Sequence, residues 1–206
     1  MTLSASEVNK IKQVHSDDGV LPIFHERWSS RAFADREVSD ADLKRVFEAA
    51  RWAASSGNEQ PWRFVVGRRG TETHEKIFAS LVGFNQSWAG KAPVLILGVA
   101  KGRFNRNDAH NEYALYDLGA ATSYLTLQAA ALGLTTHQMA GFEHEKARRL
   151  LEIPEGYVFG AVIALGYQGE PESLGNEKLI EREVAPRERK GLEELVFAEW
   201  GKVLAL

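Results

Sequence analysis

Two long runs of apolar residues constrain the fold more than any other feature. They read "APVLILGVA" over residues 92–100 and "YVFGAVIALG" over residues 157–166. A strand with one face in water alternates apolar and polar residues, so a uniformly apolar strand must be covered on both faces. We therefore expect both runs to form interior strands of a sheet that is flanked by helices. Both fall far short of the roughly 20 residues needed to span a bilayer.

Amphipathic segments supply helices to cover such a sheet. "VSDADLKRVFEAARWAA" predicts a helix with Ser39 as its N-cap and an apolar stripe that includes Leu43 and Val46. Residues 110–132 predict the longest helix, whose few charges indicate burial on most faces, with Gly133 ending it. Shorter elements are expected as helices over 4–14, 71–82 and 143–153 and as a strand over 62–67, with a short strand or loop over 134–141.

The predicted fold class is α+β, a small central sheet flanked by helices. Helices and strands alternate along the chain, but only three or four strands are evident, too few for a large doubly wound sheet. The length of 206 residues fits a single domain. We expect residues 1–20 to be a peripheral N-terminal extension. The segment "LEELVFAEW", residues 192–200, is amphipathic and has no evident place in a compact monomer.

Composition excludes several classes of function. The net charge is −3 and the isoelectric point is near 6.1, which gives no reason to expect a nucleic-acid or membrane partner. The absence of cysteine rules out disulfides, thiolate metal sites and a cysteine nucleophile. The N-terminal residues lack a basic start followed by an apolar run, so we expect no signal peptide and a soluble, cytoplasmic protein.

The common motifs for metals, phosphates and nucleophilic catalysis are also missing. No two of the six histidines have the spacing of metal ligands on one helix face, so no metal site is expected. Neither a Walker loop nor a G-x-G-x-x-G dinucleotide turn occurs. A G-x-S-x-G nucleophile elbow is absent as well. The usual hydrolase and dehydrogenase interpretations therefore have no support.

Three dispersed polar segments remain. In "RWSSRAF", residues 27–33, an extended backbone would place Arg27, Ser29 and Arg31 on one face. Two guanidinium groups and a hydroxyl there suit a phosphate beside an anionic or carbonyl-rich ring. "APRERK" has two further arginines, two residues apart, and "ASSGN" is a turn-prone loop with hydrogen-bond donors. Taken singly, each segment is more often a solvated face, a helix end or a polar tail.

The order of these segments changes that interpretation. "RWSSRAF" precedes "AARWAASSGNEQPWRFVV", and "FNQSWAGKAPVLILGVA", "AAALGL", "MAGF", "ALGYQGE" and a basic tail follow. This series resembles the FMN-dependent nitroreductase family over about residues 24–199, most specifically in its first two pieces. The resemblance implies a three-layer α/β/α fold with a mixed, mostly antiparallel sheet. It also implies an intertwined homodimer in which residues 170–206 reach across to the other subunit.

The resemblance also implies a set of FMN-binding residues. Arg27 and Ser29, with Trp28 between them, would hold the phosphate or ribityl end, and Arg31 would reach the N1/O2 edge, where reduced flavin carries negative charge. Asn85 would bind the pyrimidine end of the ring. The remaining implied positions are Arg187 and Arg189 on the phosphate, Ala140 and Gly141 near flavin N5, and Ala54, Ser55, Ser56 and Asn58 in a loop that comes from the other subunit.

The implied activity is a flavin oxidoreductase. NAD(P)H would pass a hydride to flavin N5, and an electron-poor acceptor such as a nitroaromatic or quinone would then be reduced in the same pocket. No side chain is expected to act as acid or base, because the flavin carries the chemistry. Candidate residues for the substrate pocket are Trp88, Phe104 and His110.

Other functions remain open on this scaffold. The fold also resembles dehalogenases, dehydrogenases and flavin-fragmenting enzymes, and a flavin-binding protein without turnover is a further alternative. Three positions depart from the family pattern. Ala54 replaces a proline, Ala140 stands where some members carry an acidic residue, and Trp88 stands where some carry a lysine.

Overall fold

A four-stranded antiparallel sheet forms the centre of the protein. The computed structural model describes residues 3–14 and 19–205. The strand order is β1-β2-β4-β3, and every pair in this sheet is antiparallel. The strands are β1 (Trp62–Arg68), β2 (Val94–Lys101), β3 (Thr135–Met139) and β4 (Tyr157–Gly166). The two apolar runs of the sequence are the inner strands β2 and β4, as predicted.

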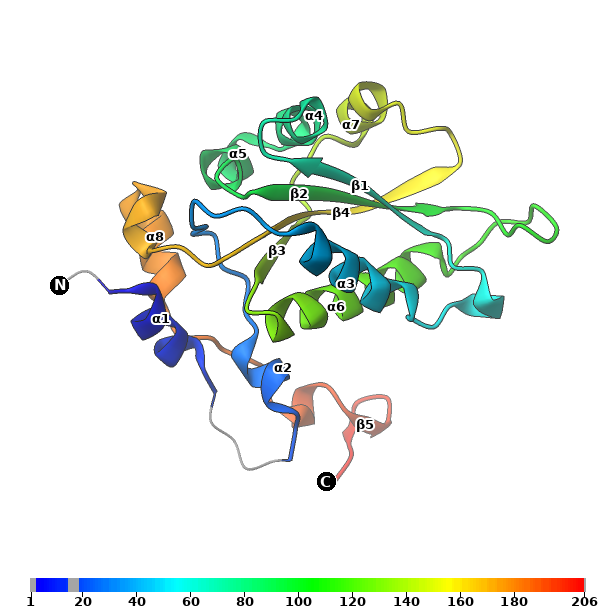
Figure 1. The fold of residues 1–206 in the computed structure, drawn as a ribbon. Coiled ribbons are helices and arrows are strands. Elements are labelled where there is room, and N and C mark those ends of the chain that lie inside the picture. The colour runs from blue at the N-terminus through cyan, green and yellow to red at the C-terminus, as the bar shows by residue number, and fades with distance from the viewer. Residues whose placement is uncertain (1–2, 15–18, 206) are drawn as a thin grey trace.

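Helices cover both faces of this sheet. On one side lie α4 (Glu72–Ser80), α5 (Gly83–Ala89) and α7 (His144–Leu151), and on the other lie α3 (Asp40–Arg51) and α6 (Ala114–Ala131) (Figure 1). Strand β2 contributes Leu95 and Leu97 to one apolar core and Val94 and Ile96 to the other. Its uniform apolarity follows from this double burial, and the predicted α+β layer architecture is confirmed.

The predicted helix boundaries hold, with one shift. Ser39 caps α3 by accepting the Asp42 N–H at 3.1 Å, and Gly133 follows the end of α6 with a φ of 73°. Helix α6 begins at Ala114 rather than near residue 110. The Asn111 side chain accepts the Tyr113 N–H at 3.1 Å, and residues 112–113, directly before the helix, form a turn. Local side-chain capping of this kind competes with a further helical turn.

Three helices lie at one end of the sheet. They are α1 (Ala5–Lys12), α2 (Pro22–Glu26) and α8 (Glu177–Val184), with a 3₁₀ turn η2 (Pro171–Leu174) before α8. Helix α1 contacts α8, and both Val8 and Lys12 of α1 are buried. The α1 helix falls within the range predicted as a peripheral N-terminal extension. Residues 15–18 of that range lie outside the described part of the chain.

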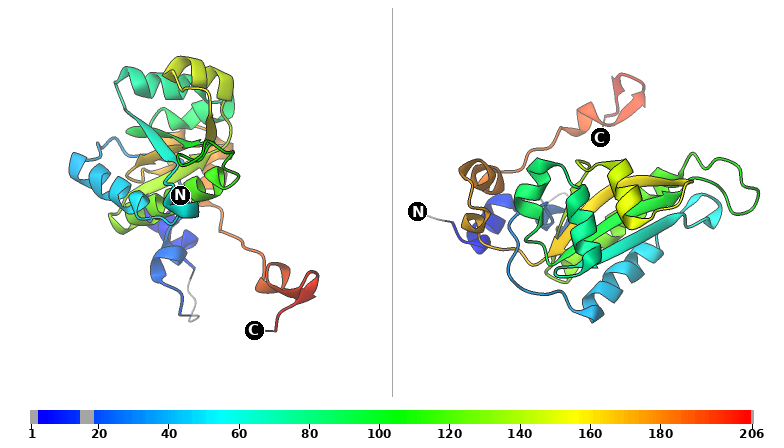
Figure 2. Two further views of the ribbon diagram at one scale, coloured as in Figure 1. Left: turned by 90° about the vertical axis from the view of Figure 1, so that its right-hand side faces the viewer. Right: turned by 90° about the horizontal axis from the view of Figure 1, so that it is seen from above.

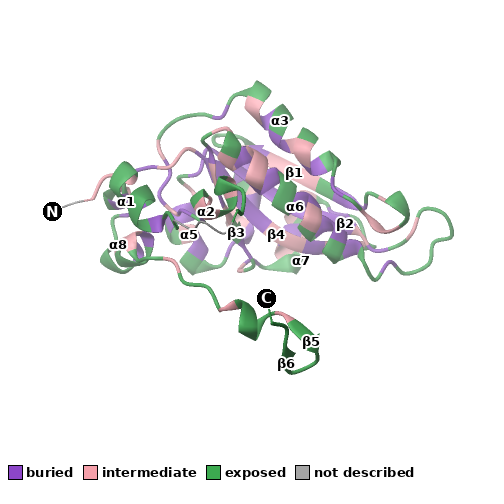
Figure 3. Cartoon of the chain, turned by 90° about the horizontal axis from the view of Figure 1, so that it is seen from below, coloured by how far each residue is buried: buried purple, intermediate pink, exposed green. Residues whose placement is uncertain are grey.

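The C-terminal segment leaves the layered body. After α8 the chain runs outward to a 3₁₀ turn η3 (Leu192–Glu194) and a small hairpin of β5 (Phe197–Glu199) and β6 (Lys202–Val203) (Figure 2). Nearly all of this segment is exposed (Figure 3). Trp200 is 97% exposed. In the described parts of the chain, no helix is long and apolar enough to cross a membrane.

Candidate functional site

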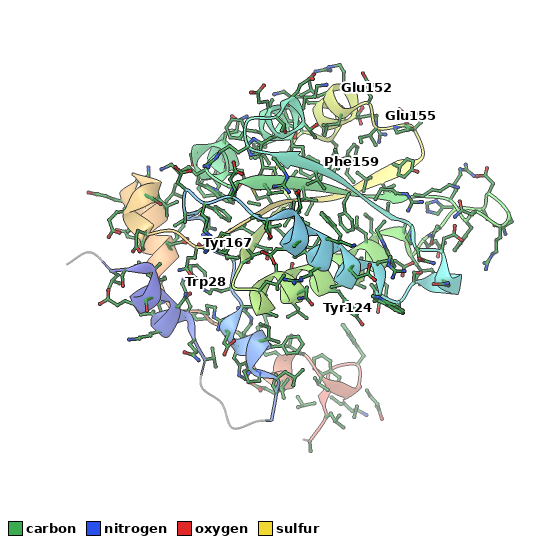
Figure 4. All side chains as sticks on the ribbon, viewed as in Figure 1. Trp28, Tyr124, Glu152, Glu155, Phe159 and Tyr167 are labelled. Atoms are coloured by element: carbon green, nitrogen blue, oxygen red, sulfur yellow. The ribbon has the colours of Figure 1, made fainter. Side chains whose placement is uncertain are left out.

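The "RWSSRAF" segment contains no helix, and its burial alternates over residues 27–32 as it does in an extended segment. It follows the end of α2, and residues 27, 29 and 31 are at least partly exposed, whereas residues 28, 30, 32 and 33 are buried. The Trp28 side chain is labelled in Figure 4. Its indole N–H donates to Asn9 Oδ1 of α1 at 2.8 Å, and Lys12 Nζ lies 4.7 Å from its ring centroid. The buried tryptophan therefore anchors the segment while its two arginines share the opposite face.

A group of arginines gathers at the start of this segment. Arg187 Nη1 donates to the Arg27 carbonyl at 2.7 Å, and Arg27 Nη1 lies 3.5 Å from Ser29 Oγ. Burial lowers the pKa of Arg27, and the charge of Arg189 lowers it further. The pKa of Arg187 is lowered by burial, by Arg189 and by Arg27. The sequence-distant arginines 27, 187 and 189 thus share one region and repel each other, which favours an anionic ligand among them.

Arg31 lies beside an aromatic cluster. Its guanidinium carbon is 6.0 Å from the Trp88 ring centroid, and the His137 ring is tilted against Trp88 with a centroid distance of 4.7 Å. His137 Nδ1 lies 3.1 Å from the Ser29 carbonyl and 3.2 Å from the Ser30 carbonyl. Because carbonyl oxygens only accept hydrogen bonds, Nδ1 carries the proton. Burial, followed by the charge of Arg31, lowers the pKa of His137 to about 4, so the ring is neutral at pH 7.

The turn after β3 meets α5 next to this cluster. Asn85 Nδ2 of α5 donates to the Gly141 carbonyl at 2.9 Å, and the Val82 N–H donates to the same oxygen at 3.1 Å. A Cβ atom on Gly141 would come within 2.8 Å of Asn85 Nδ2, so a side chain at this position would displace the Asn85 amide. Ala140, the preceding residue, is exposed. The turn therefore presents backbone rather than a bulky side chain to this side of the site.

Three buried donors in this region have no hydrogen-bond partner among the described residues. They are Arg31 Nε, Trp88 Nε1 and Arg187 Nε. An unsatisfied buried donor is costly, and such groups commonly bind a ligand. Together with the excess of positive charge, they fit a ligand with a phosphate and a carbonyl-bearing ring.

The predicted site residues of the 54–58 loop, together with Phe104 and His110, lie near the first turn of α6. The loop with Ser55, Ser56 and Asn58 begins after α3, and the Ser56 N–H donates to Asp117 Oδ2 in the first turn of α6 at 3.1 Å. The Asn105 N–H donates to Glu59 Oε1 at 2.6 Å, which joins this loop to the turn that carries Phe104 and His110. Ala54 is exposed at the start of the loop. These residues form a second group, which we call the far loop.

Helix α6 separates the two groups. The far loop contacts its first turn, whereas a hollow of about 300 Å³ beside Arg27 and Trp28 is lined by Ala130 and Gly133 at its other end. The 18 residues of α6 make it about 27 Å long. The contact of the far loop at Asp117 and the hollow at Ala130 are therefore about 20 Å apart along the helix. Trp88, which is 1% exposed, lies with the first group, whereas Phe104 and His110 lie with the far loop.

The far loop has an unusual backbone. Gly57, Asn58 and Gln60 all have φ between 50° and 59°, in the left-handed region. Non-glycine residues rarely adopt this conformation, and its occurrence at two positions within one short loop is typical of functional loops. The Gln60 N–H donates to Ser55 Oγ at 2.9 Å, which helps to hold this conformation.

Sequence reasoning missed three residues of the first group. His137 gave no signal because a lone histidine in a short strand is unremarkable. Phe84 is 49% exposed and lies next to the Arg182 guanidinium, and its position beside Asn85 in the sequence was the available signal. Glu183 of α8 is fully buried four residues after Leu179, so a carboxylate at an apolar helix position marked it. No cluster of potential metal ligands occurs among the described residues.

Comparison with known proteins agrees with this geometry. The profile of the Nitroreductase family matches residues 25–87 and 71–167. The chain belongs to the nitroreductase family. An uncharacterised 15.4 kDa protein of Mycolicibacterium smegmatis is 38% identical over 150 residues, covering 69% of this chain and 99% of that protein.

Two further relatives carry functional descriptions. A protein of Archaeoglobus fulgidus, named provisionally as an NADH dehydrogenase/NAD(P)H nitroreductase, is 31% identical over 151 residues, 71% of this chain and 84% of that protein. A crystal structure described as an oxidoreductase containing FMN superimposes with a TM-score of 0.83 at 33% identity, covering 89% of this chain and 93% of that one. The family profile ends before α8, so it does not include Arg187 or Arg189.

Proposed function

We propose that this nitroreductase is an FMN-dependent oxidoreductase that transfers electrons from NAD(P)H to an electron-poor small molecule such as a quinone or nitroaromatic. The observation that carries the proposal is the convergence of cations and unpartnered buried donors around the extended segment that starts at Arg27. FMN in a related structure and an NAD(P)H nitroreductase name on a relative support it.

Each part of the first group matches one part of FMN. Arg27, Arg187 and Arg189 would hold the phosphate, because guanidinium groups bind phosphate oxygens in pairs and the ligand's charge relieves their mutual repulsion. Ser29, exposed beside Arg27, would contact the ribityl hydroxyls. Arg31 would lie at the N1/O2 edge. These assignments satisfy the orphaned Nε–H groups of Arg31 and Arg187.

Asn85 and the 140–141 turn would flank the ring. Asn85 is held by the Gly141 carbonyl and keeps its own Oδ1 as an acceptor for an imide N–H. The Trp88 ring lies beside Arg31 and carries no charge. Arg31 would therefore supply the positive charge at this end of the flavin ring. FMN supplies reversible two-electron chemistry when bound. The fixed charge of Arg31 stabilises the negative charge that develops on reduction.

The overall reaction needs no acid or base from the chain. NAD(P)H and one proton are consumed, the acceptor gains two electrons and two protons, and NAD(P)⁺ is released. Donor and acceptor would use the same exposed side in turn. Phe84, with 49% of its surface exposed next to Asn85, offers an apolar face on which a planar ring can lie.

We further propose a homodimer in which the far loop of one chain completes the site of the other. Asp117, which the far loop contacts, and Ala130, which lines the hollow beside Arg27, are about 20 Å apart along α6, so a second chain would supply the far loop if both groups contact one ligand. The outer side of α6 exposes Tyr116 and Tyr124, and the C-terminal segment exposes Leu195 and Trp200. These apolar surfaces suit burial against a second copy.

Flavin content and turnover together test the proposal. We expect the purified protein to contain FMN and to oxidise NADH or NADPH at a steady state once a quinone is added. Bound flavin without such turnover would indicate a flavin-binding protein that stores or senses FMN. A protein that takes up no flavin at all would overturn the proposal.

A further inference from the structure

A buried carboxylate accepts hydrogen bonds from residues 30–32 of the proposed FMN-binding segment. Glu183 of α8 has no exposed surface. Its Oε1 accepts the Ser30 hydroxyl at 2.6 Å, the Arg31 N–H at 3.0 Å and the Ala32 N–H at 3.1 Å, and its Oε2 accepts the Arg31 N–H at 3.0 Å. One side chain therefore satisfies three donors on consecutive residues of the segment.

These bonds fix the backbone where the site needs it. Extended segments alternate their faces, so a backbone held at residues 30–32 determines where Arg31 and Ser29 point. From the opposite side, the His137 imidazole donates to the Ser29 or Ser30 carbonyl. Of the two contacts, the one with Glu183 involves more donors and is the more deeply buried.

The carboxylate is also tied to the N-terminal helix. Lys12 of α1 is 5% exposed and donates to the backbone carbonyls of Arg182 and Ala185. These two residues flank the pair 183–184 at the end of α8. Burial lowers the pKa values of Lys12 and Arg31, and the Glu183 charge is the largest influence that opposes this. Lys12 thus links α1 to α8, and Glu183 links α8 to the segment.

We propose that Glu183 is the positioning residue of this site, holding residues 30–32 so that Arg27, Ser29 and Arg31 present a preformed receptor to the flavin. The inference rests on the proposed function. Its physical basis is that a preorganised receptor does not spend binding energy on ordering the segment. Glu183 does not touch the ligand, and its effect passes through the three donors that it accepts.

Electrostatics alone predicts the opposite effect of its loss. Removing a carboxylate from a region with Lys12, Arg31, Arg182 and Arg187 makes that region more positive, which should strengthen the binding of an anionic ligand. If Glu183 acts by position, its removal weakens binding in spite of the added positive charge. The sign of the change therefore separates the two effects.

The test compares Glu183→Gln with Glu183→Leu in the full-length protein after removal of flavin. Both variants lose the charge, but only glutamine keeps an acceptor for the Ser30, Arg31 and Ala32 donors. Binding of FMN and of riboflavin is measured by quenching of flavin fluorescence, and hydrogen exchange of the Arg31 and Ala32 amides is measured without ligand. Glu181→Gln, on an exposed residue of α8, is the control for charge.

We expect Glu183→Gln to bind FMN within about threefold of the wild type, and Glu183→Leu to bind it at least tenfold more weakly. In Glu183→Leu, the preference for FMN over riboflavin should shrink, and the Arg31 and Ala32 amides should exchange faster than in the wild type. Equal FMN binding by both variants, or unchanged exchange in Glu183→Leu, overturns the positioning role. If Glu183→Leu does not fold, Ser30→Ala, which removes the 2.6 Å bond, should weaken FMN binding in the same direction. Unchanged binding there also overturns it. Wild-type protein that takes up no flavin identifies failure of the proposed function instead.

Discussion

A cis–trans test of two lesions examines whether one site draws on two chains. Arg27→Ala should remove the proposed charge-assisted contact with the FMN phosphate, worth about 1.5–3 kcal/mol, which corresponds to a loss of roughly ten- to more than a hundredfold in FMN affinity. Gly57→Val forces a branched side chain into a backbone with φ of 59°, which costs on the order of 1–3 kcal/mol and displaces the far loop. The two positions lie at opposite ends of α6.

Heterodimers with one lesion on each chain are isolated with two different affinity tags. If the far loop serves the partner's site, one site contains both lesions and the other contains neither, so one FMN per dimer binds with wild-type affinity. Heterodimers with both lesions on one chain and none on the other should have no intact site. The reverse pattern, an intact site only when both lesions share a chain, would refute the two-chain site.

Three further predictions concern single residues. Arg189→Ala should weaken FMN binding about tenfold or more and leave riboflavin binding nearly unchanged, since riboflavin lacks the phosphate; equal losses by titration would contradict a phosphate contact. Gly141→Ala should displace the Asn85 amide and weaken flavin binding from a few-fold to about tenfold with little change in melting temperature, and full flavin retention would show that Asn85 is not a ligand. His137 has a pKa of about 4 in the folded chain against an ordinary value of 6.5, so the unfolded chain binds more protons between these values. The stability from this residue is complete above pH 6.5 and falls by roughly 3 kcal/mol as the pH drops to 4. Denaturant titrations should show that His137→Gln loses this part of the pH dependence, and an unaltered profile would contradict the assignment.

Much of the fold was predictable because burial leaves a direct mark on composition. The apolar runs at β2 and β4 identify strands covered on both faces, and the Ser39 cap identifies the start of α3. The hairpin in the C-terminal segment was not predictable. Its alternation is short, and Trp200 lies against Phe197 of the same hairpin while remaining 97% exposed, so no buried face imposes a pattern on the sequence.

The site was predictable only in part, for a different reason. Arg27, Ser29 and Arg31 follow from alternation in an extended segment, a local property. Glu183 and His137 hydrogen-bond to that segment although they lie more than 100 positions away in the sequence. Tertiary contacts of this kind leave no local periodicity. The two-residue spacing of Arg187 and Arg189 likewise gave no indication that Arg187 would donate to the Arg27 carbonyl.

Anaerobic reduction of the FMN-loaded protein tests the central claim most directly. Visible absorption is recorded while NADPH, and in a separate sample NADH, is added in small steps without oxygen. The account predicts that at least one of the two donors bleaches the bound flavin with one equivalent per site, and that added quinone restores the colour. Bound flavin that neither donor bleaches would contradict the assignment of this member of the nitroreductase family as an NAD(P)H-dependent oxidoreductase.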